Sequence, residues 1–189
     1  MTQARPSEQM RTLGVVQHGA PILTEPARRF DLPTEREGAE QDVEMLFASM
    51  ERIARVHPFA KGMGIAAPQI GIPRAAAVVQ PAEEGAGAIV LLNPRITASS
   101  EDCDEQYEGC LSFFDVRTLV PRALTITVET TTLDGTTVTT DYTRGLARLI
   151  AHEIDHLDGL LTLNRLRPGV GPIPIEEYRQ TGQSWAYDS

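Results

Sequence analysis

Residues 152–156 read HEIDH and place two histidines four residues apart. On an α-helix this spacing puts His152 and His156 one turn apart on the same face, where both imidazoles can bind one ion. Glu153 projects roughly 100° around the helix from His152, so it can hold a water molecule beside the ion as general base. Apolar residues flank the motif on both sides. Because carboxylates are costly to bury in such a helix without a compensating cation, the sequence predicts a metal-binding helix.

A catalytic metal site also needs a third protein ligand and a position left open for water. Thr162 stands where the metzincin pattern has its third histidine and cannot replace an imidazole. Glu176 has the separation of the thermolysin-like pattern and would make the chain a zincin-type endopeptidase, but its surroundings, GPIPIEEY, do not predict a helix. Cys110 is the remaining candidate. Its thiolate beside two imidazoles would suit Fe(II), Zn(II) or Ni(II).

The composition narrows the class of protein. The 189 residues include 17 Lys and Arg against 26 Asp and Glu, a net charge of −9 that disfavours direct binding to nucleic acid or to anionic membranes. The sequence has no apolar run of the roughly 18 residues that a membrane span requires, and the opening MTQARPSEQMR lacks the apolar stretch of a secretory signal. We therefore expect a cytoplasmic protein, in which Cys103 is an ordinary surface thiol.

Hydrophobic periodicity predicts two helices. The first covers about 34–56, with Thr34 and Glu37 as a capping box. The second covers about 143–159, contains HEIDH, and can end at Gly159. Helices and strands are segregated along the chain, which favours an α+β fold in which small antiparallel or mixed β-sheets pack around the central metal-binding helix.

The rest of the chain is consistent with one domain over residues 1–189. Residues 1–12 are polar and unpatterned and predict a mobile tail, Leu13–Gln17 is the first expected element, and residues 167–189 predict an irregular C-terminal segment. Asp134 and Gly135 form a hairpin turn signal. Strands are predicted at 75–79, 88–92, 124–132 and 136–142.

Three motifs occur in a fixed order: GMGIAAPQ at 62–69, EGCLS at 108–112 and HEIDH at 152–156. Together they resemble the motifs of peptide deformylases, and the resemblance extends from about Val15 to Arg165. It implies a hydrolase that removes the formyl group from the N-terminal formyl-methionine of nascent polypeptides and releases formate. A transient association with the ribosome is a further implication.

The resemblance also implies the roles of individual residues. One divalent ion, Fe2+ with Zn2+, Ni2+ or Co2+ as substitutes, would be bound by Cys110, His152 and His156. Glu153 would be the general acid and base, while the side-chain amide of Gln69 and the backbone N–H of Leu111 would stabilise negative charge on the formyl oxygen. The pocket for the peptide substrate would be lined by Met63, Gly64, Gly109, Arg117, Arg148 and Leu149.

Three positions depart from the family pattern. Phe114 stands where a proline is common, Asn164 where an aspartate is usual, and Arg148 where many members have an apolar residue. A guanidinium at Arg148 is expected to narrow or polarise the methionine pocket. An alternative outside catalysis is a peptide-binding protein with a structural ion, but such an ion would need neither Glu153 nor Gln69.

Overall fold

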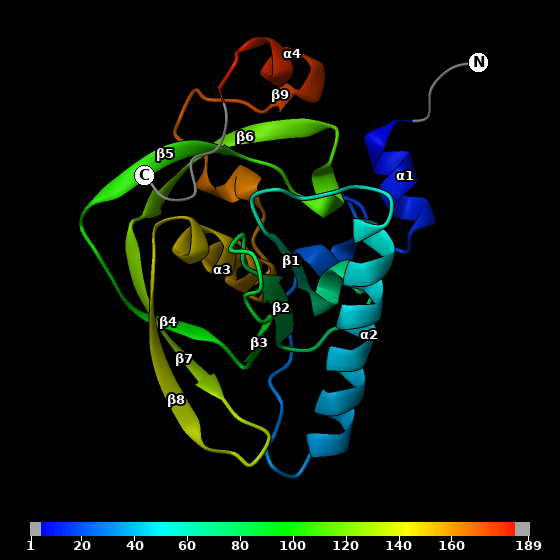
Figure 1. Cartoon of the computed structure of the whole chain (residues 1–189), viewed down its shortest axis with the longest axis vertical. Coiled ribbons are helices and arrows are strands. Elements are labelled where there is room, and N and C mark those ends of the chain that lie inside the picture. Colours follow the sequence, from blue (N-terminus) through cyan, green and yellow to red (C-terminus); the bar gives the residue numbers. More distant parts are fainter. Residues whose placement is uncertain (1–4, 184–189) are drawn as a thin grey trace.

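The computed structural model describes residues 5–183 and has an α+β architecture (Figure 1). Its strands form three small antiparallel sheets, with strand orders β1-β2-β3, β4-β7-β8 and β5-β6-β9. Helix α3 lies between these sheets and α2 covers the outer side of the first one (Figure 1). The prediction of small sheets around a central helix is therefore confirmed. The four helices described are α1 (Pro6–Thr12), α2 (Arg36–Ala54), α3 (Arg144–Leu157) and α4 (Ile175–Gln180).

The strands come from apolar and polar segments alike. The predicted segments at 75–79 and 88–92, and the predicted hairpin, all form strands, whereas β1, β4, β5, β6 and β9 lie outside the predicted strands. In the first sheet the strands are β1 (Met63–Ala66), β2 (Ala76–Gln80) and β3 (Ile89–Leu92). In the second they are β4 (Arg95–Ser99), β7 (Thr125–Thr131) and β8 (Thr137–Thr143), and in the third β5 (Cys103–Glu108), β6 (Val116–Ala123) and β9 (Ile173–Pro174).

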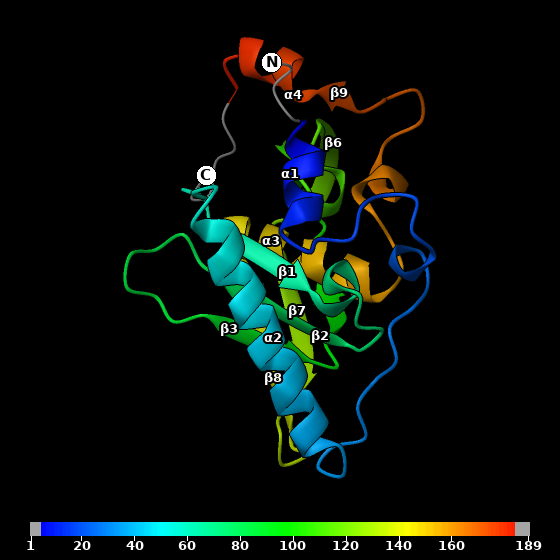
Figure 2. The ribbon, with the colours of Figure 1, turned by 90° about the vertical axis from the view of Figure 1, so that its right-hand side faces the viewer.

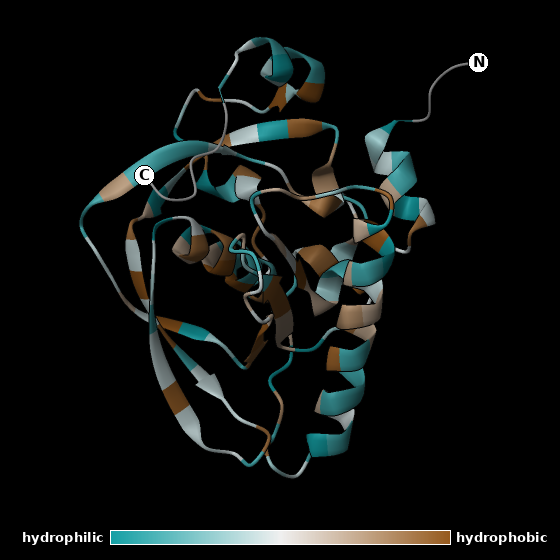
Figure 3. Cartoon of the chain, viewed as in Figure 1, coloured by the Kyte–Doolittle hydropathy of each residue, from teal (hydrophilic) through white to brown (hydrophobic). Residues whose placement is uncertain are grey.

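The core has two apolar clusters, one on each face of the first sheet. Leu46 and Ile53 of α2 pack with Val78 in one cluster, and Val79 packs with Ile150 of α3 in the other. β2 is therefore buried on both faces, and Figure 3 shows the strands between the two helices as mainly hydrophobic, while teal residues mark the outer side of α2. This arrangement buries almost the whole of α3 and fixes the direction of its side chains.

Helix boundaries follow the prediction closely, but one capping prediction is wrong. Helix α2 has Glu35 at its N-cap, without a side-chain cap, so Thr34 and Glu37 form no capping box. Helix α3 ends two residues before Gly159, which has a φ of +72° and lies so close to the backbone of Thr24 that a Cβ would come within 2.9 Å of it. Only glycine fits that turn without strain.

Three predictions for the ends of the chain are wrong. Pro6–Thr12 is helix α1 rather than part of a mobile tail, because Met10 is fully buried in the core. Leu13–Gln17 forms no strand or helix. The expected irregular C-terminal segment contains β9, which pairs with β6, followed by α4 (Figure 2). Parts of both predicted segments, residues 1–4 and 184–189, lie outside the described residues. None of the described helices combines the length and hydrophobicity needed to cross a bilayer.

Candidate metal centre and active site

Helix α3 and the end of β5 bring three metal-ligating side chains together. The ligand atoms of Cys110, His152 and His156 lie within 4.8 Å of one another, and Sγ of Cys110 is 3.3 Å from Nε2 of His156. All three residues are buried, with exposed fractions of 5%, 9% and 1%. Both histidines come from adjacent turns of α3, as the i, i+4 spacing predicts. The cysteine directly precedes the short 3-10 turn η3 (Leu111–Phe113).

Glu108 orients the first of these histidines. Nδ1 of His152 is 3.0 Å from Oε2 of Glu108, which leaves Nε2 of the same ring for a metal ion. Arg122 donates to both carboxylate oxygens of Glu108 at 2.9 Å, and Arg148 donates to Oε1 at 2.6 Å. Burial alone would raise the pKa of Glu108, but Arg122 and His152 outweigh burial and hold this pKa far below its usual range. Glu108 is therefore a fixed anion behind the metal centre.

The same buried network accounts for the aspartate inside HEIDH. Nη1 of Arg122 lies 2.6 Å from Oδ2 of Asp155, and Nη2 of Arg165 lies 2.5 Å from Oδ1. Asp155 thus has two cationic partners and is not a fourth metal ligand. The departure at Asn164 has a local role, since its Oδ1 accepts a hydrogen bond of 2.8 Å from the backbone N–H of Leu161.

The electrostatics of the three ligand side chains fit a divalent ion. Burial disfavours a thiolate at Cys110, but His156 and His152 outweigh this effect and lower the pKa of the thiol well below its usual value. A thiolate with two imidazoles is a donor set that Fe(II), Zn(II) and related ions accept. Beside these ligands, Oε2 of Glu153 is buried without a hydrogen-bond partner in the described part of the chain. A buried carboxylate oxygen without a partner is expected where a bound polar group, such as a substrate or a water molecule, supplies the missing hydrogen bond.

Glu153 is placed by close packing against strand β1. Its exposed fraction is 3%, and its carboxylate occupies the space beside Gly64, where a Cβ would lie 2.3 Å from Oε1 of Glu153. Burial raises the pKa of Glu153, and the neighbouring His152 and His156 only partly oppose this effect. Any side chain at position 64 would therefore displace the carboxylate.

Gln69 lies beside Cys110. Its Oε1 accepts a hydrogen bond of 2.9 Å from the backbone N–H of Ala66, which orients the side-chain amide. Its Nε2 donates to Oγ of Ser112 at 3.2 Å and lies 3.8 Å from Sγ of Cys110. The amide N–H2 of Gln69 is thus directed toward the metal ligands.

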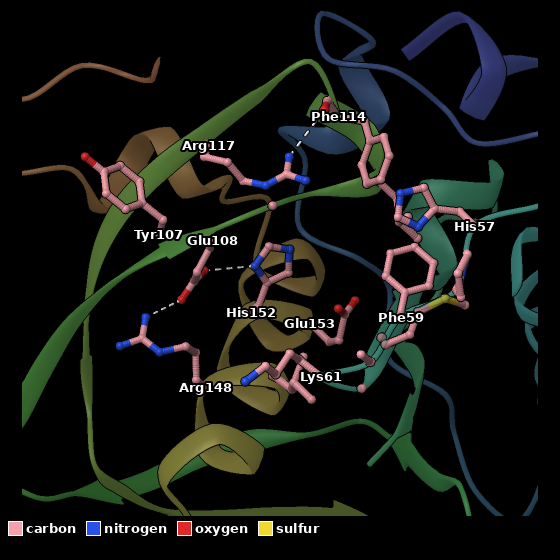
Figure 4. A pocket seen from close by; sticks show the side chains of 18 of the residues that line it. His57, Phe59, Lys61, Tyr107, Glu108, Phe114, Arg117, Arg148, His152 and Glu153 are labelled. Atoms are coloured by element: carbon pink, nitrogen blue, oxygen red, sulfur yellow. Dashed lines mark hydrogen bonds and ion pairs between the residues drawn. The ribbon is translucent and has the colours of Figure 1, made fainter. Parts of the chain in front are cut away.

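A cavity of about 300 Å³ opens beside the ligand group (Figure 4). Gln69, Leu111, His152 and Glu153 line it, whereas Cys110 and His156 lie behind its wall. All six residues predicted to contact the substrate also line it, namely Met63, Gly64, Gly109, Arg117, Arg148 and Leu149. Arg148 has an exposed fraction of only 2%. Its guanidinium donates hydrogen bonds to the carboxylates of Glu108 and Asp104 and to the backbone carbonyl of Val120. These carboxylates compensate its positive charge within the cavity wall.

Sequence reasoning missed several residues of the cavity wall. His57, Phe59 and Phe114 form an aromatic group in which the His57 ring lies 4.7 Å from Phe59 and 5.0 Å from Phe114 (Figure 4). Tyr178 joins the wall from α4. These side chains come from three distant segments, so no local pattern could have grouped them. Glu176, the third ligand of the zincin alternative, is exposed on α4 and is not in the ligand group.

Comparison with known proteins assigns the family. The sequence matches polypeptide deformylase over residues 12–170. The chain belongs to the polypeptide deformylase family. As a deformylase it is a metal-dependent hydrolase that removes N-terminal formyl groups.

Relatives from different organisms resemble this deformylase. Peptide deformylase from Acidobacterium capsulatum is 38% identical over 154 residues, which cover 80% of this chain and 85% of that protein. The chloroplastic peptide deformylase 1A of Solanum lycopersicum is 31% identical over 170 residues, 82% of this chain but 59% of that protein. The Met-Ala-Ser-bound crystal structure of the class I type b peptide deformylase from Acinetobacter baumannii aligns with a TM-score of 0.67 and 30% identity, covering 80% of this chain and 96% of that chain.

Proposed function

We propose that this deformylase acts on the formyl-methionine of nascent polypeptides, with Cys110, His152 and His156 holding one ferrous ion and Glu153 moving the proton. The observation that carries this proposal is the buried Cys-His-His group beside an unpartnered glutamate oxygen at the wall of an open cavity. Zn2+, Ni2+ or Co2+ can take the place of iron, because the same three donors suit each of these ions.

The reaction adds water to the formyl carbon and breaks the bond between that carbon and the amine nitrogen. The ion, when bound, supplies positive charge that polarises the formyl oxygen and lowers the pKa of water. Glu153 accepts a proton from the attacking water and passes it to the departing nitrogen, and its burial favours the protonated form needed for the second step. The products are formate and a free N-terminal amine.

Negative charge develops on the formyl oxygen when water attacks, and placed donors must stabilise it. We assign this role to the side-chain amide of Gln69 and the backbone N–H of Leu111. Gln69 is suited to it because Ala66 and Ser112 fix the amide before the substrate arrives, so little reorganisation accompanies the reaction.

Strand β1 supplies an edge along which an extended substrate can bind. Among residues 5–183, β1 pairs with β2 alone, and its residues Met63 and Gly64 line the cavity. Pairing between a peptide backbone and this edge would tolerate many sequences, while the cavity receives the first side chain. The bound Met-Ala-Ser in the Acinetobacter baumannii relative supports methionine as that first residue. We place the reaction in the cytoplasm, with transient ribosome association, since nascent chains are made there and a thiolate ligand stays reduced.

Formate release from a formyl-methionyl peptide, using protein prepared and loaded with iron in the absence of oxygen, tests the proposal. We expect turnover by the wild type, weaker metal binding with loss of activity in Cys110→Ser, and retained metal with loss of activity in Glu153→Ala. Cys103→Ser is the matched control because Cys103 is the exposed cysteine. No formate from fully metallated wild type, or full activity in Glu153→Ala, would contradict the proposal.

A further inference from the structure

Two elements at the ends of the chain flank the active site although they lie almost entirely outside the matched residues 12–170. Both are fastened to the same short loop. The backbone N–H of Ser7 in α1 donates to Oδ1 of Asp115 at 2.8 Å, and the backbone N–H of Ile175 in α4 donates to the carbonyl of Asp115 at 2.9 Å. Figure 2 shows both helices beside β6 at one end of the molecule. Helices α1 and α4 are therefore both held at the segment that joins η3 to β6.

Helix α4 reaches the cavity through Tyr178. The ring of Tyr178 lies 5.3 Å from the ring of Tyr107, and Cζ of Arg117 lies 5.8 Å from the Tyr178 ring and 5.3 Å from the Phe114 ring. Arg117 donates to the backbone carbonyls of Val116 and Phe114, and none of the ion pairs among the described residues includes it. Tyr178 and Phe114 thus hold a guanidinium at the cavity wall without neutralising it.

A second hollow of about 650 Å³ adjoins the first. The two share His57 and Phe114 as lining residues, so they meet at the aromatic group described above. The other walls of the second hollow come from the two terminal helices and the residue before α1, namely Arg5, Pro6, Glu8, Gln9, Thr12, Ile175, Glu176 and Arg179. The first cavity and the second hollow together lead from the metal ligands, past His57 and Phe114, to residues of α1 and α4.

We propose that α1 and α4 build the downstream part of the peptide-binding cleft, and that Tyr178 with Arg117 determines how the enzyme recognises residues following the formylated methionine. The inference rests on the proposed function. An extended peptide advances by roughly 3.3–3.6 Å per residue, so a substrate must continue beyond the methionine before it reaches the second hollow. The second hollow therefore binds only longer formylated peptides, and a formylated dipeptide does not reach it.

This placement predicts how substrate length affects the kinetics. The ring of Tyr178 contacts Tyr107 and Arg117 rather than a metal ligand or Glu153, so we expect its removal to change peptide binding and not kcat. Tyr178→Ala removes an aromatic contact worth roughly 0.5–1.5 kcal/mol, which converts to about a two- to tenfold rise in KM for the longer peptide. The KM for formyl-Met-Ala should rise less than the KM for the longer peptide, because Tyr178 lines the cavity that receives the methionine and only the longer peptide also extends to the second hollow.

Steady-state kinetics with formyl-Met-Ala and formyl-Met-Ala-Ser-Lys-Ala test the inference. In wild type we expect the higher kcat/KM for the longer peptide, and in Tyr178→Ala we expect that advantage to shrink at unchanged kcat. Arg179→Ala, an exposed change in the second hollow, should act in the same direction. Glu177→Ala is the control, because Glu177 is exposed on the same helix and lines neither hollow.

Two other results overturn the inference. The first is an equal loss of kcat/KM for both peptides in Tyr178→Ala, which would indicate a general structural role. The second is a ratio of kcat/KM between the longer and the shorter peptide that stays at the wild-type value in both Tyr178→Ala and Arg179→Ala. Calorimetric binding of the same peptides to metallated Glu153→Ala measures the length effect without turnover. If this binding shows the length effect while wild type releases no formate, the proposed function is wrong and the cleft is upheld.

Discussion

The glycine at position 64 offers a way to displace the catalytic carboxylate without touching a metal ligand. Built onto the backbone, a Cβ at Gly64 would lie 2.3 Å from Oε1 and 2.6 Å from both Cγ and Cδ of Glu153. Gly64 does not have a positive φ, so alanine is compatible with its backbone conformation. In Gly64→Ala the methyl group and the Glu153 side chain cannot both keep their positions, and the carboxylate must move into the cavity.

The size of the effect follows from the role of Glu153. A positioned general acid and base contributes typically 10²- to 10⁴-fold to a rate, so we expect kcat to fall by about that factor. The cost in stability should be smaller, about 1–3 kcal/mol, since the displaced group is the end of a side chain beside an open cavity. Metal content should remain that of wild type because Cys110, His152 and His156 are unaltered.

Formate release, metal content and urea denaturation together check this prediction. Gly87→Ala is the control, since a Cβ there meets nothing within 4 Å. If Gly64→Ala acts through Glu153, the double variant Gly64→Ala/Glu153→Ala should be no slower than Glu153→Ala alone. A Gly64→Ala enzyme within about threefold of wild-type kcat, or additive losses in the double variant, would refute the proposed packing of Glu153.

Other predictions concern the residues behind and beside the ligands. Glu108→Gln removes the anion that Arg122 and Arg148 share and leaves them only Asp155 and Asp104 as carboxylate partners. Urea denaturation should therefore show about 3–5 kcal/mol less stability, and wild-type stability would contradict this. Because the pKa of Glu108 is lower in the folded than in the unfolded chain, its contribution to folding stability is present above pH 4.5 and is lost as the pH falls below that value. Glu108→Gln should therefore flatten the dependence of stability on pH in this range, and an unchanged slope would argue against this role of Glu108. Gln69→Leu should lower kcat by about 10²- to 10³-fold with little change in KM, measured by formate release, and a loss confined to KM would exclude the assigned role.

The central part of the fold was predictable because its signals are local. Residues of α2 and α3 repeat with helical period, and both ligand histidines lie within one such repeat. The strands of the hairpin flank a turn signal at Asp134 and Gly135. Cys110 lies far from HEIDH in the sequence, and the resemblance of three ordered motifs was needed to connect them. The structure then brings its sulfur next to His156.

The ends of the chain and the charged network were not predictable in this way. A seven-residue helix such as α1 is too short to be stable alone and depends on burial of Met10 and on the bonds of Ser7 to Asp115. The strand β5 reads CDEQYE, which is polar and lacks an apolar run. Glu108 meets Arg122 only after β5 and β6 have paired and packed on α3. Contacts between distant segments leave no periodic signal in the sequence.

X-ray absorption at the zinc edge of zinc-loaded protein tests most directly whether Cys110, His152 and His156 bind one ion together. For wild type we predict one sulfur at about 2.3 Å and two imidazole nitrogens at about 2.0–2.1 Å, the distances usual for zinc. Cys110→Ser should lose the sulfur, and Cys103→Ser should keep it. A wild-type spectrum without sulfur, or one with sulfur that persists in Cys110→Ser, would contradict the proposed metal centre.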